Sequence, residues 1–198
     1  MSNFAKVAVL ISGGGTNLQA IIDRLAAGEL PHVELALVVS SRKNAGGLDR
    51  ADRAGIRHVY IGKENFEQDL IKLLDEHEID IIVLAGFLKI LSSDFVSRYP
   101  DRIINVHPSL IPSFCGDGFY GLRVHEAALS YGVKVTGATV HFVNEVTDGG
   151  KIIVQRAVDV KDGDTPEILQ RRVMEEAEWK LLPAAVEKVA AEIVARRG

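Results

Sequence analysis

The feature that most constrains the fold is a series of short, mostly apolar runs in which polar and apolar residues do not alternate. They cover residues 6–11, 33–39, 80–85 and 102–106. Strands of this kind are covered on both faces, as in a parallel sheet. Segments with apolar residues at helical spacing separate most of the runs, so we expect β–α–β units with right-handed connections.

The second half of the chain follows a different pattern. Residues 135–143 alternate in polarity, and residues 152–160 are expected to pair back with them as an antiparallel hairpin. Thr165 and Pro166 suit the start of a long final helix, in which Pro183 marks a place where the helix can be interrupted. The predicted fold class is α/β: a Rossmann-like, doubly wound, mostly parallel sheet with a C-terminal antiparallel hairpin and a long final helix.

The length of 198 residues fits a single domain. The change of pattern falls near Pro112. We therefore expect residues 1–112 to form a phosphate-binding βα half, and residues 113–198 to form a lid, the hairpin and the C-terminal helix. The lid is assigned to residues 113–121, which are rich in glycine and aromatic residues and stand beside the expected site.

Charge and cysteine content narrow the classes of function. The chain has 23 Lys and Arg against 27 Asp and Glu, a net charge of −4, and no basic block. Nucleic acid and anionic membrane are therefore not expected as partners. The single cysteine, Cys115, fits a reducing cytosol and has no evident base that would make it a nucleophile. Without a signal-like or membrane-spanning apolar run, a cytoplasmic location is expected.

A glycine-rich loop follows the first strand. It reads Ser12-Gly-Gly-Gly-Thr-Asn17 and leads into a helix carrying Leu18, Ile21 and Leu25 at helical spacing. A strand–glycine–helix turn directs backbone N–H groups and the positive end of the helix at one point, which favours a phosphate. The loop matches neither the Walker pattern nor Gly-x-Gly-x-x-Gly, so the expected ligand is a single phosphate on a small substrate, and a tight turn without a ligand is the alternative.

Asn105 and His107 stand where the strand at 102–106 runs into a loop that contains Pro108 and Pro112. Residues two apart on a strand face the same way, so both side chains can enter one cleft at the carboxyl end of the sheet. A carboxamide donor beside an imidazole suits an oxygen that gains negative charge during a reaction. Structural roles for both residues are the alternative that the pattern alone leaves open.

Asp148 precedes two glycines in the expected hairpin turn. A carboxylate there commonly shapes the turn, but on the same edge as His107 it can also orient the imidazole or pass a proton through water. A metal site built from His107, His125, His141 and Asp148 has no recognised ligand spacing, so no metal is expected. The absence of a convincing nucleophile favours direct transfer between two bound substrates.

Four blocks of this sequence resemble the phosphoribosylglycinamide formyltransferases, the folate-dependent enzymes of purine synthesis. The blocks begin at Leu10, Leu84, Ile104 and His141, and read LISGGGTNLQAI, LAGFLKIL, INVHPSLIP and HFVNEVTDGG. They occur in order over nearly the whole chain. The resemblance implies transfer of a formyl group from 10-formyltetrahydrofolate, as co-substrate, to the amine of glycinamide ribonucleotide.

The resemblance also implies roles for individual residues. Asn105, His107 and Asp148 match the catalytic trio, and Glu178 matches the glutamate that binds the ribose hydroxyls after a one-residue shift in the last helix. The expected phosphate-binding residues are Gly15, Thr16 and Asn17. The expected folate-binding residues are Leu88, Lys89, Ile90, Leu91, Val143 and Asn144. The segment after Pro112 is longer than in the commonest family form, and Arg123 stands where that form has its first histidine.

Three other functions compete with this one. Formyltetrahydrofolate hydrolase and methionyl-tRNA formyltransferase share part of the pattern, although each is expected to carry a further domain. A non-catalytic folate or nucleotide binding module would use the same cleft without chemistry. The expected partners are small molecules, with no nucleic acid and no membrane, and the protein is expected to be a monomer or a homodimer.

Overall fold

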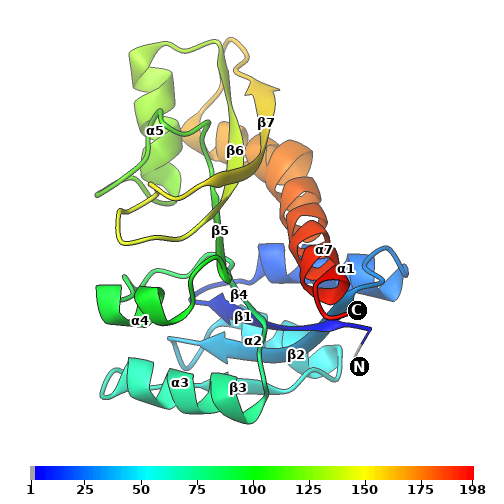
Figure 1. Cartoon of the computed structure of the whole chain (residues 1–198). Coiled ribbons are helices and arrows are strands. Elements are labelled where there is room, and N and C mark those ends of the chain that lie inside the picture. Colours follow the sequence, from blue (N-terminus) through cyan, green and yellow to red (C-terminus); the bar gives the residue numbers. More distant parts are fainter. Residues whose placement is uncertain (1–2) are drawn as a thin grey trace.

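Seven strands form one sheet in the computed structural model, which describes residues 3–198 (Figure 1). Their order is β3-β2-β1-β4-β5-β6-β7, and the first five are parallel neighbours, whereas β6 and β7 pair antiparallel. The strands are β1 (Ala5–Ile11), β2 (Val33–Ser40), β3 (His58–Tyr60), β4 (Ile81–Leu84), β5 (Ile103–His107), β6 (Val135–Phe142) and β7 (Ile152–Asp159). The predicted fold class is confirmed; the division of the chain at Pro112 stays a prediction.

Seven α-helices and one π-helical segment are found among the described residues. They are α1 (Thr16–Ala26), α2 (Gly46–Arg53), α3 (Phe66–Glu76), α4 (Ser93–Arg98), α5 (Leu122–Tyr131), α6 (Pro166–Val173), the π segment (Met174–Glu178) and α7 (Trp179–Ala195). Sequence analysis missed α4, which is too short to show an apolar period. Its start does have a signal, because the Ser92 hydroxyl accepts the Phe95 N–H as an N-cap.

Side chains along β1 alternate between two apolar cores. Val7, Val9 and Ile11 face the core shared with α1, α2 and α7. Ala8 and Leu10 face the core shared with α3 and α4. Because helices cover both faces, a strand without alternation of polarity is stable at the centre of the sheet. The unbroken apolar run at 6–11 has this physical cause.

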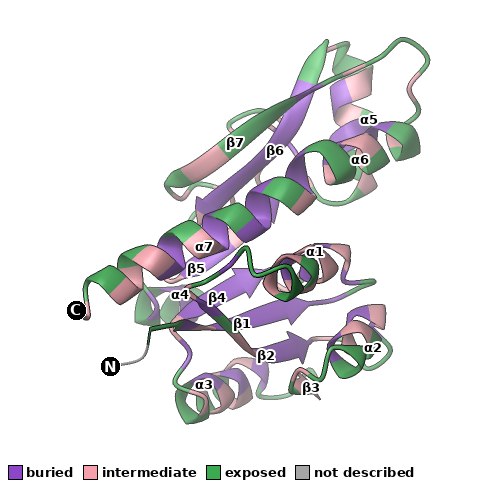
Figure 2. Cartoon of the chain, turned by 90° about the vertical axis from the view of Figure 1, so that its right-hand side faces the viewer, coloured by how far each residue is buried: buried purple, intermediate pink, exposed green. Residues whose placement is uncertain are grey.

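The long C-terminal helix joins the two parts of the sheet (Figure 2). Its buried stripe, which includes Leu182, Val186 and Val189, packs in the same core as α1 and β1. The helix is not interrupted at Pro183, which lies inside α7. The irregularity falls instead at the π segment, whose wider turn holds one extra residue and so changes the direction of the side chains that follow. Pro183 lies five residues after the end of the π segment.

The carboxyl ends of β1, β4 and β5 lie side by side, because β4 pairs in parallel with both β1 and β5. The chain reverses its strand order between β1 and β4, and such a switch point is where open α/β sheets bind ligands. Strand β5 continues through His107, one residue beyond the predicted end. Within residues 3–198 no helix is long and apolar enough to cross a membrane.

Truncation of a side chain under α7 tests the role of this helix in joining the sheet. Leu182 is fully buried, so Leu182→Ala should lower the free energy of unfolding by about 3 kcal/mol through lost burial and the cavity left behind. Ile168→Ala, on α6 and half exposed, is the matched control and should cost much less. Urea denaturation measures both. Equal losses in the two variants would contradict this packing role.

Candidate active site

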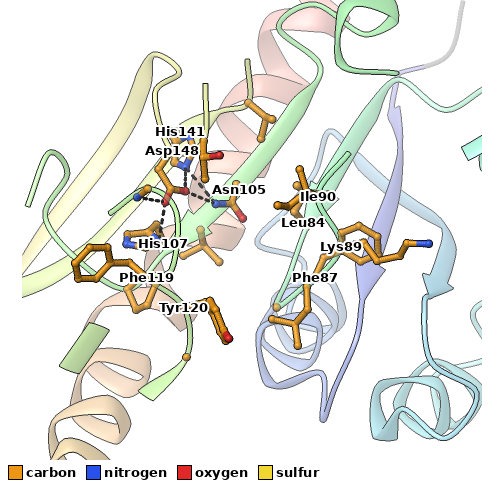
Figure 3. Close-up of a pocket in the computed structure, with 18 of the residues that line it drawn as sticks. Leu84, Phe87, Lys89, Ile90, Asn105, His107, Phe119, Tyr120, His141 and Asp148 are labelled. Atoms are coloured by element: carbon orange, nitrogen blue, oxygen red, sulfur yellow. Dashed lines mark hydrogen bonds and ion pairs between the residues drawn. The ribbon is translucent and has the colours of Figure 1, made fainter. Parts of the chain in front are cut away.

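A cleft of about 710 Å³ opens at the carboxyl ends of β1, β4 and β5 (Figure 3). This volume is within the range of small-molecule sites. Every residue that the sequence predicted for a site lines it, apart from Gly15, which lies in the loop at its edge. Polar groups from β5 and the β6–β7 turn face one side of the cleft, and the apolar segment after β4 faces the other. The residues predicted from separate parts of the chain therefore converge.

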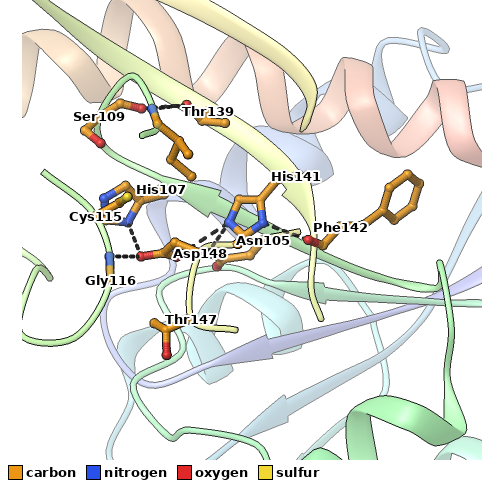
Figure 4. A network of polar contacts seen from close by, with 12 residues as sticks. Asn105, His107, Ser109, Cys115, Gly116, Thr139, His141, Phe142, Thr147 and Asp148 are labelled. Carbon is orange, nitrogen blue, oxygen red and sulfur yellow. Dashed lines mark hydrogen bonds and ion pairs between the residues drawn. The ribbon is translucent and has the colours of Figure 1, made fainter. Parts of the chain in front are cut away.

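Asn105, His107 and Asp148 lie together at one point of the cleft (Figure 4). Asp148 Oδ2 is 3.4 Å from His107 Nδ1, and Asp148 Oδ1 is 3.5 Å from Asn105 Nδ2. Asn105 and His107 share a face of β5, as the period of two requires. Asp148 has a left-handed backbone with φ of 54°, a conformation that short polar residues tolerate, and this turn brings its carboxylate back over β5.

His141 completes this group, although it was not among the predicted site residues. It lies directly opposite Asn105 in the antiparallel pairing of β5 with β6. Its Nδ1 donates to the Phe142 carbonyl at 2.8 Å, so the other ring nitrogen, Nε2, is left to accept from Asn105 Nδ2 at 3.2 Å. His141 thus orients the carboxamide. Its position near the end of an alternating strand was visible in the sequence, but the register that places it opposite Asn105 was not.

The lid supplies two backbone contacts that the sequence could not reveal. The carbonyl of Phe114 accepts from His107 Nε2 at 2.8 Å. The Gly116 N–H donates to Asp148 Oδ2 at 2.9 Å. A contact made by the backbone does not depend on residue type, so the sequence gives no sign of it. Only the folded structure shows that the lid contacts both His107 and Asp148.

The charge states of the pair follow from these contacts. Burial lowers the pKa of His107 below its ordinary value, and the Asp148 carboxylate and the Phe114 carbonyl oppose that effect. Burial alone would raise the pKa of Asp148, but the contacts from His141, the Gly116 N–H and His107 together hold it below its usual range. Asp148 therefore stays a carboxylate near neutral pH, beside an imidazole that can exchange a proton.

A third histidine, His125 on α5, lies near His107. His125 is fully buried, and neither of its ring nitrogens has a hydrogen-bond partner among the described residues. Burial, together with the nearby His107, lowers its pKa to about 4. His125 is therefore neutral at physiological pH, and it adds no positive charge that would disfavour an imidazolium at His107.

The glycine loop forms the edge of the cleft nearest α1. Gly15 has φ of 71°, and a Cβ there would lie 2.6 Å from the Gly47 Cα, so both the conformation and the close approach require glycine. A Cβ at Gly13 or Gly14 would meet nothing within 4 Å. The first N–H groups of α1 have no partners within the helix and point toward this open edge. Such a helix start is suited to an anion.

Asn17 and Glu178 meet next to this loop. Asn17 Nδ2 donates to Glu178 Oε2 at 2.7 Å, although the two residues are far apart in the sequence. Glu178 is buried, which raises its pKa, and the hydrogen bond from Asn17 partly offsets this. Glu178 is the last residue of the π segment, so the extra residue of that turn sets the direction of its side chain. Asn17 Oδ1 is buried and has no partner within residues 3–198.

The segment after β4 forms an apolar wall opposite Asn105, His107 and Asp148. Leu88 is 53% exposed and Ile90 is 83% exposed, which is unusual for aliphatic residues beside a cleft and indicates a surface available to an apolar ligand. The Leu88 N–H donates to the Ser12 hydroxyl at 2.9 Å, which ties this wall to the glycine loop. Lys89 packs its ammonium 4.0 Å from the centre of the Phe66 ring and points away from Asp148 (Figure 3).

The remaining predicted folate-binding residues also line the cleft. Val143 donates its N–H to the Ile103 carbonyl, and Asn144 caps the following turn by accepting the Val146 N–H. Both line the cleft between Asp148 and the wall, and so does Leu91.

Among residues 3–198 no group of three or more His, Cys, Asp and Glu side chains has an arrangement that could hold a metal ion.

This arrangement is suited to a reaction in which an oxygen becomes anionic. The two contacts of Asp148 with His107 and Asn105, at 3.4 and 3.5 Å, are longer than the 2.7–3.2 Å of a usual N–H···O bond. The two donors are therefore held close to the carboxylate without being strongly bound to it. His141 holds the Asn105 carboxamide, and the Phe114 carbonyl holds the His107 ring, so both groups have fixed orientations beside the cleft.

Comparison with known proteins identifies related chains. Residues 5–186 match the family described as formyl transferase. The chain is 46% identical over 192 residues to the trifunctional purine biosynthetic protein adenosine-3 of Homo sapiens, covering 94% of this chain but 18% of that protein. It is 39% identical to the phosphoribosylglycinamide formyltransferase of Haemophilus influenzae, covering 91% of this chain and 85% of the relative.

A solved structure shows the same fold. The glycinamide ribonucleotide transformylase 1 of Symbiobacterium toebii superimposes with a TM-score of 0.89 at 39% identity, covering 97% of this chain and 90% of that one. The chain thus spans a small part of its human relative and nearly all of the bacterial ones. These likenesses confirm the resemblance found in the four sequence blocks.

Removal of the Asp148 charge tests the electrostatics of the site. The carboxylate favours the imidazolium form of His107, so Asp148→Asn should lower the pKa of His107 further below 6.5. Titration of the His107 ring signals by NMR measures the change. Asp117→Asn, which removes an exposed carboxylate of the lid, is the control and should leave that pKa unchanged. An unchanged or higher pKa in Asp148→Asn would contradict the assigned geometry.

Proposed function

Because the chain belongs to the formyl transferase family, we propose that it transfers a formyl group from 10-formyltetrahydrofolate to the amine of glycinamide ribonucleotide, in the synthesis of purines. The products are formylglycinamide ribonucleotide and tetrahydrofolate. The observation that carries the proposal is the convergence of Asn105, His107 and Asp148 between an anion-binding loop and an apolar wall. One end of the cleft suits a phosphate and the other a flat apolar ring, with the reacting groups between them.

Asn105 and His107 hold the oxygen of the formyl group in this proposal. Attack by the substrate amine turns the formyl carbon tetrahedral and gives its oxygen a negative charge. The Asn105 NH₂ and a protonated His107 donate to that oxygen, so they bind the transition state more strongly than the ground state. His141 assists this step indirectly, because its Nε2 accepts a hydrogen bond from the Asn105 carboxamide and fixes the orientation of that group.

Asp148 takes part in the proton transfers of the proposed reaction. The attacking amine must lose a proton, and the folate nitrogen must gain one as its bond to the formyl carbon breaks. Asp148 is ionised near neutral pH and lies within 3.6 Å of His107, His141 and Asn105, so it can take the first proton directly or through a water molecule. His107, whose pKa is lowered by burial, can return a proton to the leaving nitrogen.

The ribonucleotide binds along the glycine loop. Backbone N–H groups of Gly15, Thr16 and Asn17 at the start of α1 hold the phosphate, in a site that supplies positive potential despite the net charge of −4. Glu178, held by Asn17, accepts hydrogen bonds from the ribose hydroxyls. Asn17 thereby links the phosphate and ribose positions. Its unpartnered Oδ1 is free to accept a donor from the ligand or a bound water.

The formyl folate lies in the apolar part of the cleft. Leu88 and Ile90 cover one face of its ring system, with backbone groups of Lys89 and Leu91 available as polar partners, and Val143 and Asn144 stand on the other side. The volume of about 710 Å³ is enough for a drug-sized ligand. Metal ions have no role in this proposal.

Three other functions are tested by one assay. Incubation with 10-formyltetrahydrofolate, with and without glycinamide ribonucleotide, should produce tetrahydrofolate only when the acceptor is present. Tetrahydrofolate formed without the acceptor would indicate a hydrolase. Formylation of methionyl-tRNA instead would indicate the tRNA enzyme, and binding of both ligands without turnover would indicate a binding module.

Loss of one oxyanion donor should slow the chemical step. Asn105→Ala is expected to lower kcat on the order of a hundredfold while KM for each substrate stays within a few-fold, because the donor acts mainly in the transition state. Steady-state kinetics with each substrate varied measures both constants. Asn144→Ala, which lines the folate part of the cleft but lies outside the trio, is the comparison variant and should change KM for the folate rather than kcat. Full activity in Asn105→Ala would show that the assignment is wrong.

Glu178 is expected to affect binding more than chemistry. Glu178→Gln keeps the shape of the side chain and the contact with Asn17, but it removes the negative charge of the carboxylate that accepts hydrogen bonds from the ribose hydroxyls. KM for the ribonucleotide should therefore rise about tenfold, with little change in kcat. Glu176→Gln, exposed in the same π segment, is the matched control. A KM equal to that of the control would remove Glu178 from the binding site.

A further inference from the structure

The lid is held against the catalytic group by backbone atoms on either side of Cys115. Phe114 presents its carbonyl to His107 Nε2 at 2.8 Å, and Gly116 presents its N–H to Asp148 Oδ2 at 2.9 Å. Both contacts depend on the path of the main chain through this short stretch. A displacement of the lid would remove one partner from each catalytic side chain at the same time.

Phe114 requires support to keep this path. Its φ of 49° lies in the left-handed region, where a side chain with a Cβ is strained. Ring contacts on two sides hold it in place: the Phe119 ring lies 6.4 Å away and the Tyr131 ring 6.0 Å away, both edge to face. Phe119 belongs to the lid, whereas Tyr131 is the last residue of α5. Tyr131 is therefore the ring that joins the lid to the body of the protein.

In the described part of the chain, the side chain of Tyr131 makes no hydrogen bond and no ring contact other than the one with Phe114. It is 81% exposed, and it is absent from the lining of the cleft. Helix α5 ends there because Gly132 takes the left-handed C-cap position, which leaves the ring at the end of the helix and next to Phe114. A large ring so exposed gains little from its own burial, so its contact with Phe114 is its main interaction.

We propose that Tyr131 is a positioning residue for the formyl transfer: its ring holds Phe114, and through the lid backbone it keeps His107 and Asp148 in the reactive arrangement. This inference rests on the proposed function for its effect on rate. Its structural part, the link from Tyr131 to the two lid contacts, does not depend on the identity of the substrates.

Several titratable groups surround His107, and they determine how a change in the lid would alter its pKa. Asp148 and His141 face it from β6 and the turn that follows, His125 from α5, and Cys115 lies in the lid near Asp148. Burial is the largest cause of the lowered pKa of His107, and the Phe114 carbonyl opposes it more weakly. Loosening of the lid admits water, so the pKa of His107 should move back toward 6.5.

The test compares Tyr131→Ala with Tyr131→Phe, which keeps the ring, and with Tyr60→Ala, an exposed tyrosine on β3. In the substrate-free protein, Tyr131→Ala should speed hydrogen exchange of the Gly116 amide and raise the pKa of His107, both measured by NMR. In the formyl-transfer assay it should lower kcat by about two- to tenfold, the change that corresponds to one aromatic pair. Tyr131→Phe and Tyr60→Ala should match the unsubstituted protein in all three.

Two results would overturn the inference. One is Gly116 exchange and His107 titration in Tyr131→Ala that are the same as in Tyr60→Ala. The other is an unchanged kcat although exchange and titration are altered, because the order of the lid would then have no effect on the reaction. A protein inactive in formyl transfer without any substitution would refute the proposed function instead, and the NMR comparison would still decide whether Tyr131 holds the lid.

Discussion

The buried Asp148 carboxylate is the interaction on which the arrangement of the site depends. It contacts His107 and Asn105 on β5, His141 on β6, and the Gly116 N–H of the lid. These groups come from three separate parts of the chain. A buried carboxylate is costly without partners, so the folded state is favoured only when all of them are in place. The same contacts that satisfy the charge also bring Asn105, His107 and His141 together.

The sheet provides the rigid base for these contacts. Parallel strands place Asn105 and His107 at the edge where β1 and β4 also end, and the antiparallel pairing of β5 with β6 sets His141 opposite Asn105. The segments outside the sheet contribute backbone groups, from Phe114 and Gly116, and one turn residue, Asp148. This division fits the proposed reaction, in which donors to a developing charge must be held beforehand and a lid must open for substrates to enter.

Two buried polar groups near the cleft do not add to the stability of the fold. Glu178 is buried beside Asn17, and His125 is buried without a hydrogen-bond partner in residues 3–198. Each costs free energy that the two apolar cores on either side of β1 must offset. The π segment belongs to the same group of features, because a regular helix would be the simpler structure and would direct Glu178 elsewhere.

Sequence alone determined the fold class, the glycine loop after the first strand and the candidate residues that meet in the cleft, because apolar periodicity, glycine spacing and side-chain chemistry are local properties. It did not reveal α4, the uninterrupted path of the last helix through Pro183, or the part played by His141. Only tertiary structure decided these, together with the lid contacts from Phe114 and Gly116. Register between strands and the direction of backbone groups arise from packing between distant segments, and no pattern of residue types along the chain encodes them by itself.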